Sequence, residues 1–202
     1  MKIFNSLLFA ITVLVIRCSC TQMQKNTEVN SKEATTSVSS DSIELLALTK
    51  NLLKWHEADL KGDFPSMSDN DSVFTGIDWP THKARMEELS KTNFFTQEFM
   101  DNYQKIALQL DKELKQNPVK YYEGELPPYG NGANEWCNCQ DYPSDVWNRL
   151  MIKNIKLEKD IASYYWTWGD DLNYFVKAKK ENGYWKITSL ERFDVKNYTW
   201  KP

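Results

Sequence analysis

The feature that most constrains the fold is a change of hydrophobic period after residue 147. Four segments rich in β-branched and aromatic residues then follow one another, at 148–158, 161–169, 172–180 and 184–193. Glu181-Asn182-Gly183 separates the last two, and Asn-Gly tolerates the positive φ angles of a tight hairpin turn. Gly169-Asp170-Asp171 is a second, weaker turn signal. The spacing predicts a four-stranded antiparallel meander.

Helical periodicity dominates the part of the chain before these strands. Residues 43–62 repeat leucine and tryptophan at three- and four-residue steps. Asp41 or Ser42 is a suitable cap for this helix, and Gly62 is a suitable end. A shorter helix is expected to begin at His82.

Another long helix is expected after Thr96, which is a suitable N-cap, and Asn117-Pro118 ends it. Residues 63–81 and 117–146 are rich in turn-forming residues and predict irregular loops. Because helices come first and strands second, we predict an α+β fold in which N-terminal helices pack on a curved C-terminal four-stranded antiparallel sheet.

The first residues have the pattern of an export signal. Lys2 precedes a mostly apolar run over 3–16, which is shorter than the roughly 20 residues that a membrane span needs. We therefore predict a signal peptide over residues 1–19. Residues 20–42 are rich in Ser, Thr and Asn and predict a disordered tether, lipid-anchored or free. Residues 43–202 then form a single α+β domain.

Cys20 is the expected site of lipidation. It follows Ser19, and bacterial lipoprotein signals place a small residue before the cysteine that is acylated. Cys18 follows Arg17 and fits this pattern less well, although it stays an alternative for the modified residue. The expected location is the cell envelope, with anchoring to a membrane through Cys20. Simple cleavage, which would give a soluble secreted or periplasmic protein, also stays open.

Charge narrows the range of partners. Removal of residues 1–19 would take two of the 25 basic residues and none of the 28 acidic ones, which leaves a net charge of −5. A chain of this charge is not built to hold nucleic acid electrostatically. We expect no nucleic-acid partner, and contact with a membrane through the lipid anchor.

Four motifs carry a family resemblance. In chain order they are LLKWHEADL, FFTQEFMDNY, CQDYP and ENGYWKI, and they lie within residues 43–193. Together they resemble the nuclear-transport-factor-2-like superfamily, and more narrowly a family of exported bacterial lipoproteins with no assigned biochemical role. The resemblance implies a cystatin-like α+β cone with a pocket at one end. The resemblance also implies that the protein could form a homodimer through its sheets.

The segment NEWCNCQDYPSDVW, residues 134–147, concentrates cysteine, aromatic and acidic residues. Cys137 and Cys139 form a single C-x-C, whereas zinc and redox sites usually use C-x-x-C with further ligands or a helix N-terminus. We expect no metal and no cofactor here, and either a disulfide or two thiols that stiffen the loop. The acidic DNDSVF at 69–74 lacks the glycine and glutamate of a calcium loop.

A catalytic reading depends on the resemblance alone. Enzymes of that superfamily place Asp, His or Tyr in the cone pocket, so His56, Asp141 and Tyr103 would be general base, orienting acid and hydrogen-bond donor. The simpler interpretation makes His56 a surface or packed helix histidine. The chain has no G-x-S-x-G, P-loop or H-E-x-x-H motif.

The aromatic residues are the most informative group. Strand periodicity places Tyr164, Trp166 and Trp168 on one face of the sheet and Tyr165 on the other. Core packing explains most of them, but an aromatic row beside the 134–147 loop also fits a ligand cleft. The predicted binding residues are Trp55, Tyr103, Trp136, Gln140, Asp141, Tyr164 and Trp166. Asp141 equally fits a turn that caps its own backbone.

These features predict an exported, lipid-anchored, non-catalytic binding protein of the cell envelope. Its partner would be a small molecule, a glycan, a peptide or an envelope protein. Two alternatives stay open. One is a pocket enzyme of the isomerase or hydratase kind, and the other is an inhibitor or immunity-type protein that blocks an envelope enzyme with loop 124–147.

Overall fold

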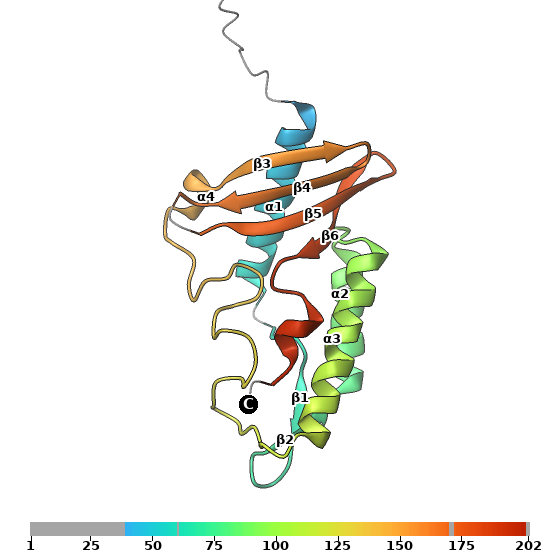
Figure 1. The fold of residues 1–202 in the computed structure, drawn as a ribbon, viewed down its shortest axis with the longest axis vertical. Coiled ribbons are helices and arrows are strands. Elements are labelled where there is room, and N and C mark those ends of the chain that lie inside the picture. The colour runs from blue at the N-terminus through green and yellow to red at the C-terminus, as the bar shows by residue number, and fades with distance from the viewer. Residues whose placement is uncertain (1–38, 60, 170–171, 201–202) are drawn as a thin grey trace, which may run out of the picture. The chain divides into compact units, whose positions relative to one another are not determined.

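The computed structural model describes residues 39–59, 61–169 and 172–200. Helices precede a four-stranded antiparallel sheet, so the predicted α+β class is confirmed (Figure 1). The elements in chain order are α1 (Ser40–Ala58), β1 (Ser66–Ser68), β2 (Phe74–Ile77), α2 (Trp79–Lys91), α3 (Gln97–Gln116), α4 (Val146–Arg149), β3 (Met151–Glu158), β4 (Ile161–Thr167), β5 (Tyr174–Glu181), β6 (Tyr184–Leu190) and the 3-10 helix η1 (Val195–Tyr198).

Several predictions fall on parts of the chain that lie outside the described residues. They are the signal peptide, both N-terminal cysteines, most of the tether and the turn residues Asp170 and Asp171. The cone shape and the homodimer also stay predictions.

Helix α1 begins earlier than its sequence pattern indicates. Ser39 is its cap, because the Ser39 side chain accepts a hydrogen bond from Ser42 N at 3.2 Å. Residues 40–42, which we predicted as the end of the tether, therefore form the first turn of the helix. The helix ends at Ala58, before Gly62, where Asp59 turns to an extended backbone conformation.

The predicted cap of α3 is confirmed. Thr96 Oγ1 accepts from Phe99 N at 3.3 Å, and the helix ends at Asn117. Helix α2 was expected from His82 but begins at Trp79, because Asp78 accepts from Thr81 N and Pro80 fits the first turn.

The prediction of an irregular loop over 63–81 is wrong, because β1 and β2 form a short hairpin there. The acidic DNDSVF stretch makes its turn, in which Asp69 Oδ1 accepts from Asp71 N at 3.0 Å and from Val73 N at 2.9 Å. Strand β2 docks on α3, where Ile77 N donates to Asp111 Oδ1 at 3.0 Å.

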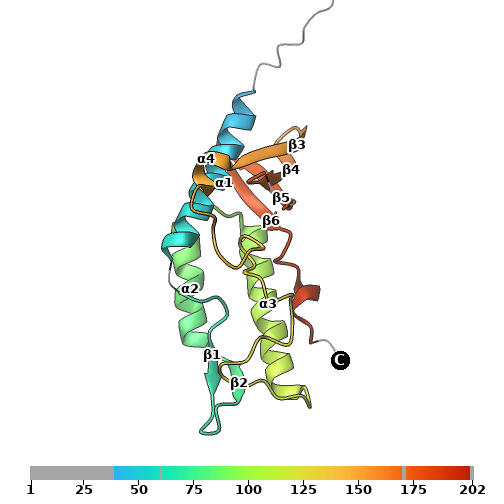
Figure 2. The ribbon, with the colours of Figure 1, turned by 90° about the vertical axis from the view of Figure 1, so that its left-hand side faces the viewer.

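The main sheet has the order β3-β4-β5-β6, and α1 lies along one of its faces (Figures 1 and 2). The predicted hairpin turn is confirmed, since Asn182 and Gly183 have φ angles of 53° and 84°. The free side of β6 is paired in part by the connector before α3. Ile187 N donates to Phe94 O at 2.7 Å, and Thr96 N donates to Ile187 O at 2.9 Å.

The two faces of the sheet differ as the alternation predicts. Tyr164, Trp166 and Trp168 are buried against the helices, and Tyr165 on the opposite face is partly exposed. The residues before β3 differ from the prediction. The strand expected from residue 148 begins only at Met151, because α4 occupies 146–149.

Candidate functional site

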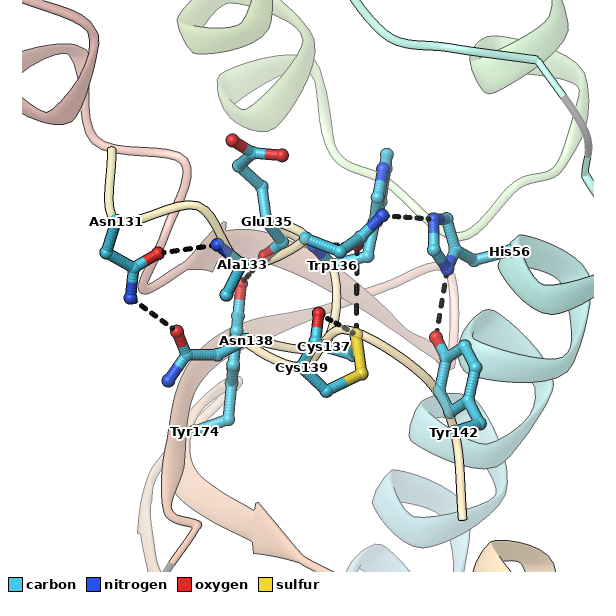
Figure 3. Close-up of a disulfide and its surroundings, with 11 residues drawn as sticks. His56, Asn131, Ala133, Glu135, Trp136, Cys137, Asn138, Cys139, Tyr142 and Tyr174 are labelled. Carbon is cyan, nitrogen blue, oxygen red and sulfur yellow. Dashed lines mark hydrogen bonds between the residues drawn. A yellow bond between two sulfur atoms is a disulfide. The ribbon is translucent and has the colours of Figure 1, made fainter. Parts of the chain in front are cut away.

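The 134–142 segment is attached to the helices by Trp136 (Figure 3). The Trp136 side chain is only 1 % exposed, and its ring lies 5.6 Å from that of Trp55 and 5.5 Å from that of His56. Its Nε1 donates a hydrogen bond to Asp63 Oδ2. The space in which we expected a ligand cleft is therefore filled by this indole.

Asp63 is the centre of a buried polar network. Its Oδ1 accepts from Tyr103 OH at 2.6 Å and from Arg85 Nε and Nη2 at 3.2 and 3.1 Å. Arg85 also donates to Asp59, and its side chain is 4 % exposed. Burial alone would lower the pKa of Arg85, but Asp63 and Asp59 raise it above its usual value. Asp63, Arg85, Tyr103 and Trp136 are bonded within this network, which therefore supports the fold.

The catalytic candidates His56 and Tyr103 have different hydrogen-bond partners. Nε2 of His56 accepts from Asn134 Nδ2 at 3.4 Å, and its Nδ1 lies 2.9 Å from Tyr142 OH (Figure 3). Burial lowers the pKa of His56 and raises that of Tyr103, whose hydroxyl reaches Asp63. Asp141 is exposed and makes no hydrogen bond or ion pair with the residues that the structure describes. No hydrogen bond within the described residues joins any two of the three side chains that would form an acid–base site.

The predicted binding residues divide into two groups. The core contains Tyr103, Trp136, Tyr164 and Trp166, with Trp55 packed against it. Gln140 and Asp141 are exposed on the loop.

The two cysteines of the loop are joined. Of the two alternatives for Cys137 and Cys139, the structure contains the disulfide, with a Cα–Cα distance of 5.2 Å. Among the residues described, no group of three or more His, Cys, Asp or Glu side chains is placed to hold a metal ion.

A different hollow is formed where α1, the connector 92–94 and the β5–β6 hairpin meet. We call it the hairpin cleft; it encloses about 540 Å³ and is lined by Leu48, Thr92, Asn93, Phe94, Glu181, Asn182, Tyr184, Trp185 and Lys186. Its apolar residues come from all three segments, and most of its polar groups come from the two turns. A mostly apolar concavity with a few polar groups is typical of small-ligand sites.

Local interactions hold the walls of the hairpin cleft in place. Trp185 Nε1 donates to Asp41 Oδ1 at 3.0 Å, and Lys180 Nζ lies 5.4 Å from the centre of the same ring. On the opposite wall, Asn93 has a φ angle of 58°, and Thr92 Oγ1 donates to Leu89 O at 2.7 Å. These contacts connect both walls of the cleft to neighbouring elements.

Tyr184 is the exception in this well-packed region. Its side chain is 75 % exposed at the rim, directly after the hairpin turn. None of the cleft residues was predicted as a site residue, because the ENGYWKI motif is also explained as a hairpin turn followed by a strand. The available signal was an aromatic pair placed immediately after a tight turn, where one of the two rings has to face solvent.

Comparison with models of known protein families, with curated proteins and with solved structures gives no match. Within the described ranges, the helices are too short or too polar to span a membrane. The fold and the site therefore define an α+β domain with an aromatic cleft at one corner of its sheet.

Proposed function

We propose that the protein is an exported, lipid-anchored, non-catalytic binding protein of the cell envelope, and that the hairpin cleft holds its ligand. The observation that carries this proposal is the exposure of Tyr184, 75 %, at the rim of an apolar cavity of about 540 Å³. Burial of a tyrosine ring is favourable, and the fold leaves most of this ring in solvent. A ligand that covers it would supply the missing contact.

A neutral saccharide is the ligand class that the lining favours. Tyr184 offers a flat ring for stacking, and the exposed side chains of Asn93 and Asn182 offer amide donors and acceptors beside it. Trp185 and Phe94 form an apolar floor for the faces of a sugar ring.

The titratable groups of the cleft favour binding over catalysis. Glu181 lies 3.8 Å from Lys186 and 3.9 Å from Lys179, so its charge is already compensated. A general acid or base would need a partner of tuned pKa within reach of a substrate, and the described lining of the cleft provides no second acid.

The first test is a titration with neutral oligosaccharides, followed by NMR saturation transfer and calorimetry. We expect Tyr184→Ala to weaken binding by about tenfold, a loss of about 1.4 kcal/mol in binding free energy. Tyr122→Ala is the matched control, since Tyr122 is also exposed, at 42 %, but lies outside the cleft. Equal effects of the two variants, or binding of unstructured peptides but no saccharide, would contradict the saccharide assignment.

The location is tested separately. Cys20→Ser should abolish labelling with a fatty-acid analogue and release the protein from the membrane fraction, whereas Cys18→Ser should leave both unchanged. If only Cys18→Ser lost the label, Cys18 would be the lipidated residue. If the unmodified protein were not labelled at all, the protein would be exported without a lipid anchor.

A further inference from the structure

The face of the sheet opposite α1 has an unusual composition. Cross-strand pairing places Lys153 beside Tyr165, Lys156 beside Ser163, and Lys177 beside Ser163 on the other side. Phe175 is the partner of Tyr165 in β5, and the two rings lie 5.1 Å apart. We call this set, Lys153, Lys156, Ser163, Tyr165, Phe175 and Lys177, the lysine face.

A β-bulge brings two of these lysines to the same side. Lys153 and Lys156 are three residues apart, and in a regular strand they would project to opposite faces. The register shifts between them, so that Asn154 and Ile155 both lie opposite Tyr164. Asn154 has a φ angle of 55°, which asparagine tolerates better than most residues. The bulge therefore concentrates positive charge around the aromatic pair.

The charges of this face are only partly compensated. Lys179 and Lys186 share Glu181, but Lys153, Lys156 and Lys177 form no ion pair with any residue that the structure describes. Glu191 contacts the edge of this face, where its Oε2 accepts from Phe175 N at 2.8 Å. Positive charge is thus concentrated on one face of a chain whose net charge is negative.

The lysine face is also hollowed. An open depression of about 510 Å³ lies over it and is lined by Asn154, Ile155, Lys156, Ser163, Tyr165 and Phe175. Tyr165 and Phe175 are partly exposed at its floor, and amide, hydroxyl and ammonium donors surround them. An aromatic floor with hydrogen-bond donors and unpaired cations fits a sugar ring that carries an anionic group.

We propose that the lysine face is a second binding site, which takes an acidic polysaccharide. The aromatic pair would stack on a sugar ring, and the three lysines would bind carboxylate, sulfate or phosphate groups along the polymer. This site is independent of the hairpin cleft, because the two share no lining residue.

Two other occupants fit this surface less well. A second copy of the chain would place lysines against lysines across a two-fold axis, where like charges repel each other. A membrane surface would be met best by protruding apolar side chains, whereas the aromatic rings here lie within a hollow.

The test measures binding of polygalacturonate and dextran sulfate, with neutral dextran and phosphatidylglycerol vesicles as comparisons. We expect both acidic polymers to bind, and binding to weaken as salt is raised. The triple variant Lys153→Glu, Lys156→Glu, Lys177→Glu should bind at least about tenfold more weakly. The matched triple Lys83→Glu, Lys105→Glu, Lys112→Glu changes net charge equally on α2 and α3 and should bind as the unmodified protein does.

A variant of unchanged charge separates recognition from simple attraction. Tyr165→Ala should weaken polymer binding severalfold while every lysine is retained, and it serves also if the charge-reversed triple does not fold. The proposal is overturned if neither acidic polymer binds better than neutral dextran, if the two triples lose affinity equally, or if only the vesicles bind. Tyr184→Ala should leave binding of the acidic polymers unchanged, so that failure of one site is distinguishable from failure of the other.

Discussion

Trp136 donates its indole hydrogen to Asp63, and this bond connects the disulfide-containing loop to the helical half of the domain. The same carboxylate accepts from Tyr103 and from the guanidinium of Arg85. Asp63 thus joins α2, α3 and the 134–142 segment through one side chain. This explains how a long irregular segment keeps a defined position against the core.

Replacing this carboxylate should destabilise the whole domain. In Asp63→Asn, Arg85 loses one of its three carboxylate partners and keeps Asp59 and Glu88. The new side-chain NH2 group would also point at groups that donate to Asp63, such as Tyr103 OH. Breaking a buried ion pair typically costs about 3–5 kcal/mol, and the remaining Asp59 contact places the expected loss near 3 kcal/mol. Urea denaturation measures it, with the exposed Asp71→Asn as the control. A loss below about 1 kcal/mol would show that the network contributes little to stability.

The hydrogen bond between Tyr164 and Thr49 should make the two single substitutions that break it unequal in their effect on stability. Thr49 Oγ1 donates its single hydrogen to Leu45 O, so at 2.9 Å it is Tyr164 OH that donates to Thr49. Tyr164→Phe removes a donor and should cost about 1 kcal/mol. Thr49→Val leaves the fully buried Tyr164 hydroxyl without its acceptor and should cost more, about 2 kcal/mol.

The double variant completes this cycle. It removes both partners, so its loss of unfolding free energy should be smaller than the sum of the two single losses. Chemical denaturation of the four proteins gives the coupling. Additive losses would mean that the two hydroxyl groups do not interact in solution.

The sequence predicted the parts of the fold that depend on local pattern. The Asn182-Gly183 turn, the Thr96 cap and the inward face of Tyr164 and Trp166 follow from φ preference, capping chemistry and strand period. The β1–β2 hairpin was missed, because its strands are three and four residues long and depend on docking against α3. Short strands of this kind are specified by tertiary contacts more than by propensity.

The candidate sites were harder to predict than the fold. The high aromatic content led us to predict Trp136 and Trp166 as ligand-binding residues, but both are buried in the core. The burial of a ring depends on tertiary packing and cannot be predicted from its neighbours in sequence. The lysine face depends on a bulge at Asn154, which shifts the register of one strand by one residue. Nothing in a strand-like pattern signals such a shift.

The disulfide predicts a modest effect on stability. Cys137 and Cys139 close a very short loop, so the chain-entropy model gives only about 1–2 kcal/mol for the cross-link. Changing both residues to Ser should lower the unfolding free energy by that amount and leave Trp136 buried. Mass spectrometry of the 134–147 peptide after alkylation without reduction gives the redox state directly. Two alkylated cysteines in the mature protein would favour the dithiol alternative.

The two histidines predict that stability falls on mild acidification. Burial is the main cause that lowers the pKa of both His56 and His82, and the His82 ring is 1 % exposed with Nδ1 unbonded within the described structure. Nε2 of His82 is bonded to Gln104 Oε1 at 3.0 Å and carries the hydrogen, so protonation would place a charge on the buried Nδ1. The neutral form is therefore the one that fits the folded state.

The sign of the effect follows from which state binds protons first. Above about pH 6.5, the ordinary pKa of histidine, both states are neutral and stability is full. As the pH falls below that value, the unfolded state takes up protons before the folded state does, so stability decreases until the lowered folded pKa is reached. The decrease is at most about 1.4 kcal/mol per pH unit for each histidine.

Variants without histidine give the decisive measurement. His56 and His82 are the only two histidines of the chain, so the double variant His56→Gln, His82→Gln removes every imidazole. Urea midpoints are compared between pH 8 and pH 5.5. The unmodified protein should lose stability across this range, whereas the double variant should start less stable and stay level. A parallel decline in both proteins would assign the acid sensitivity to groups other than the histidines.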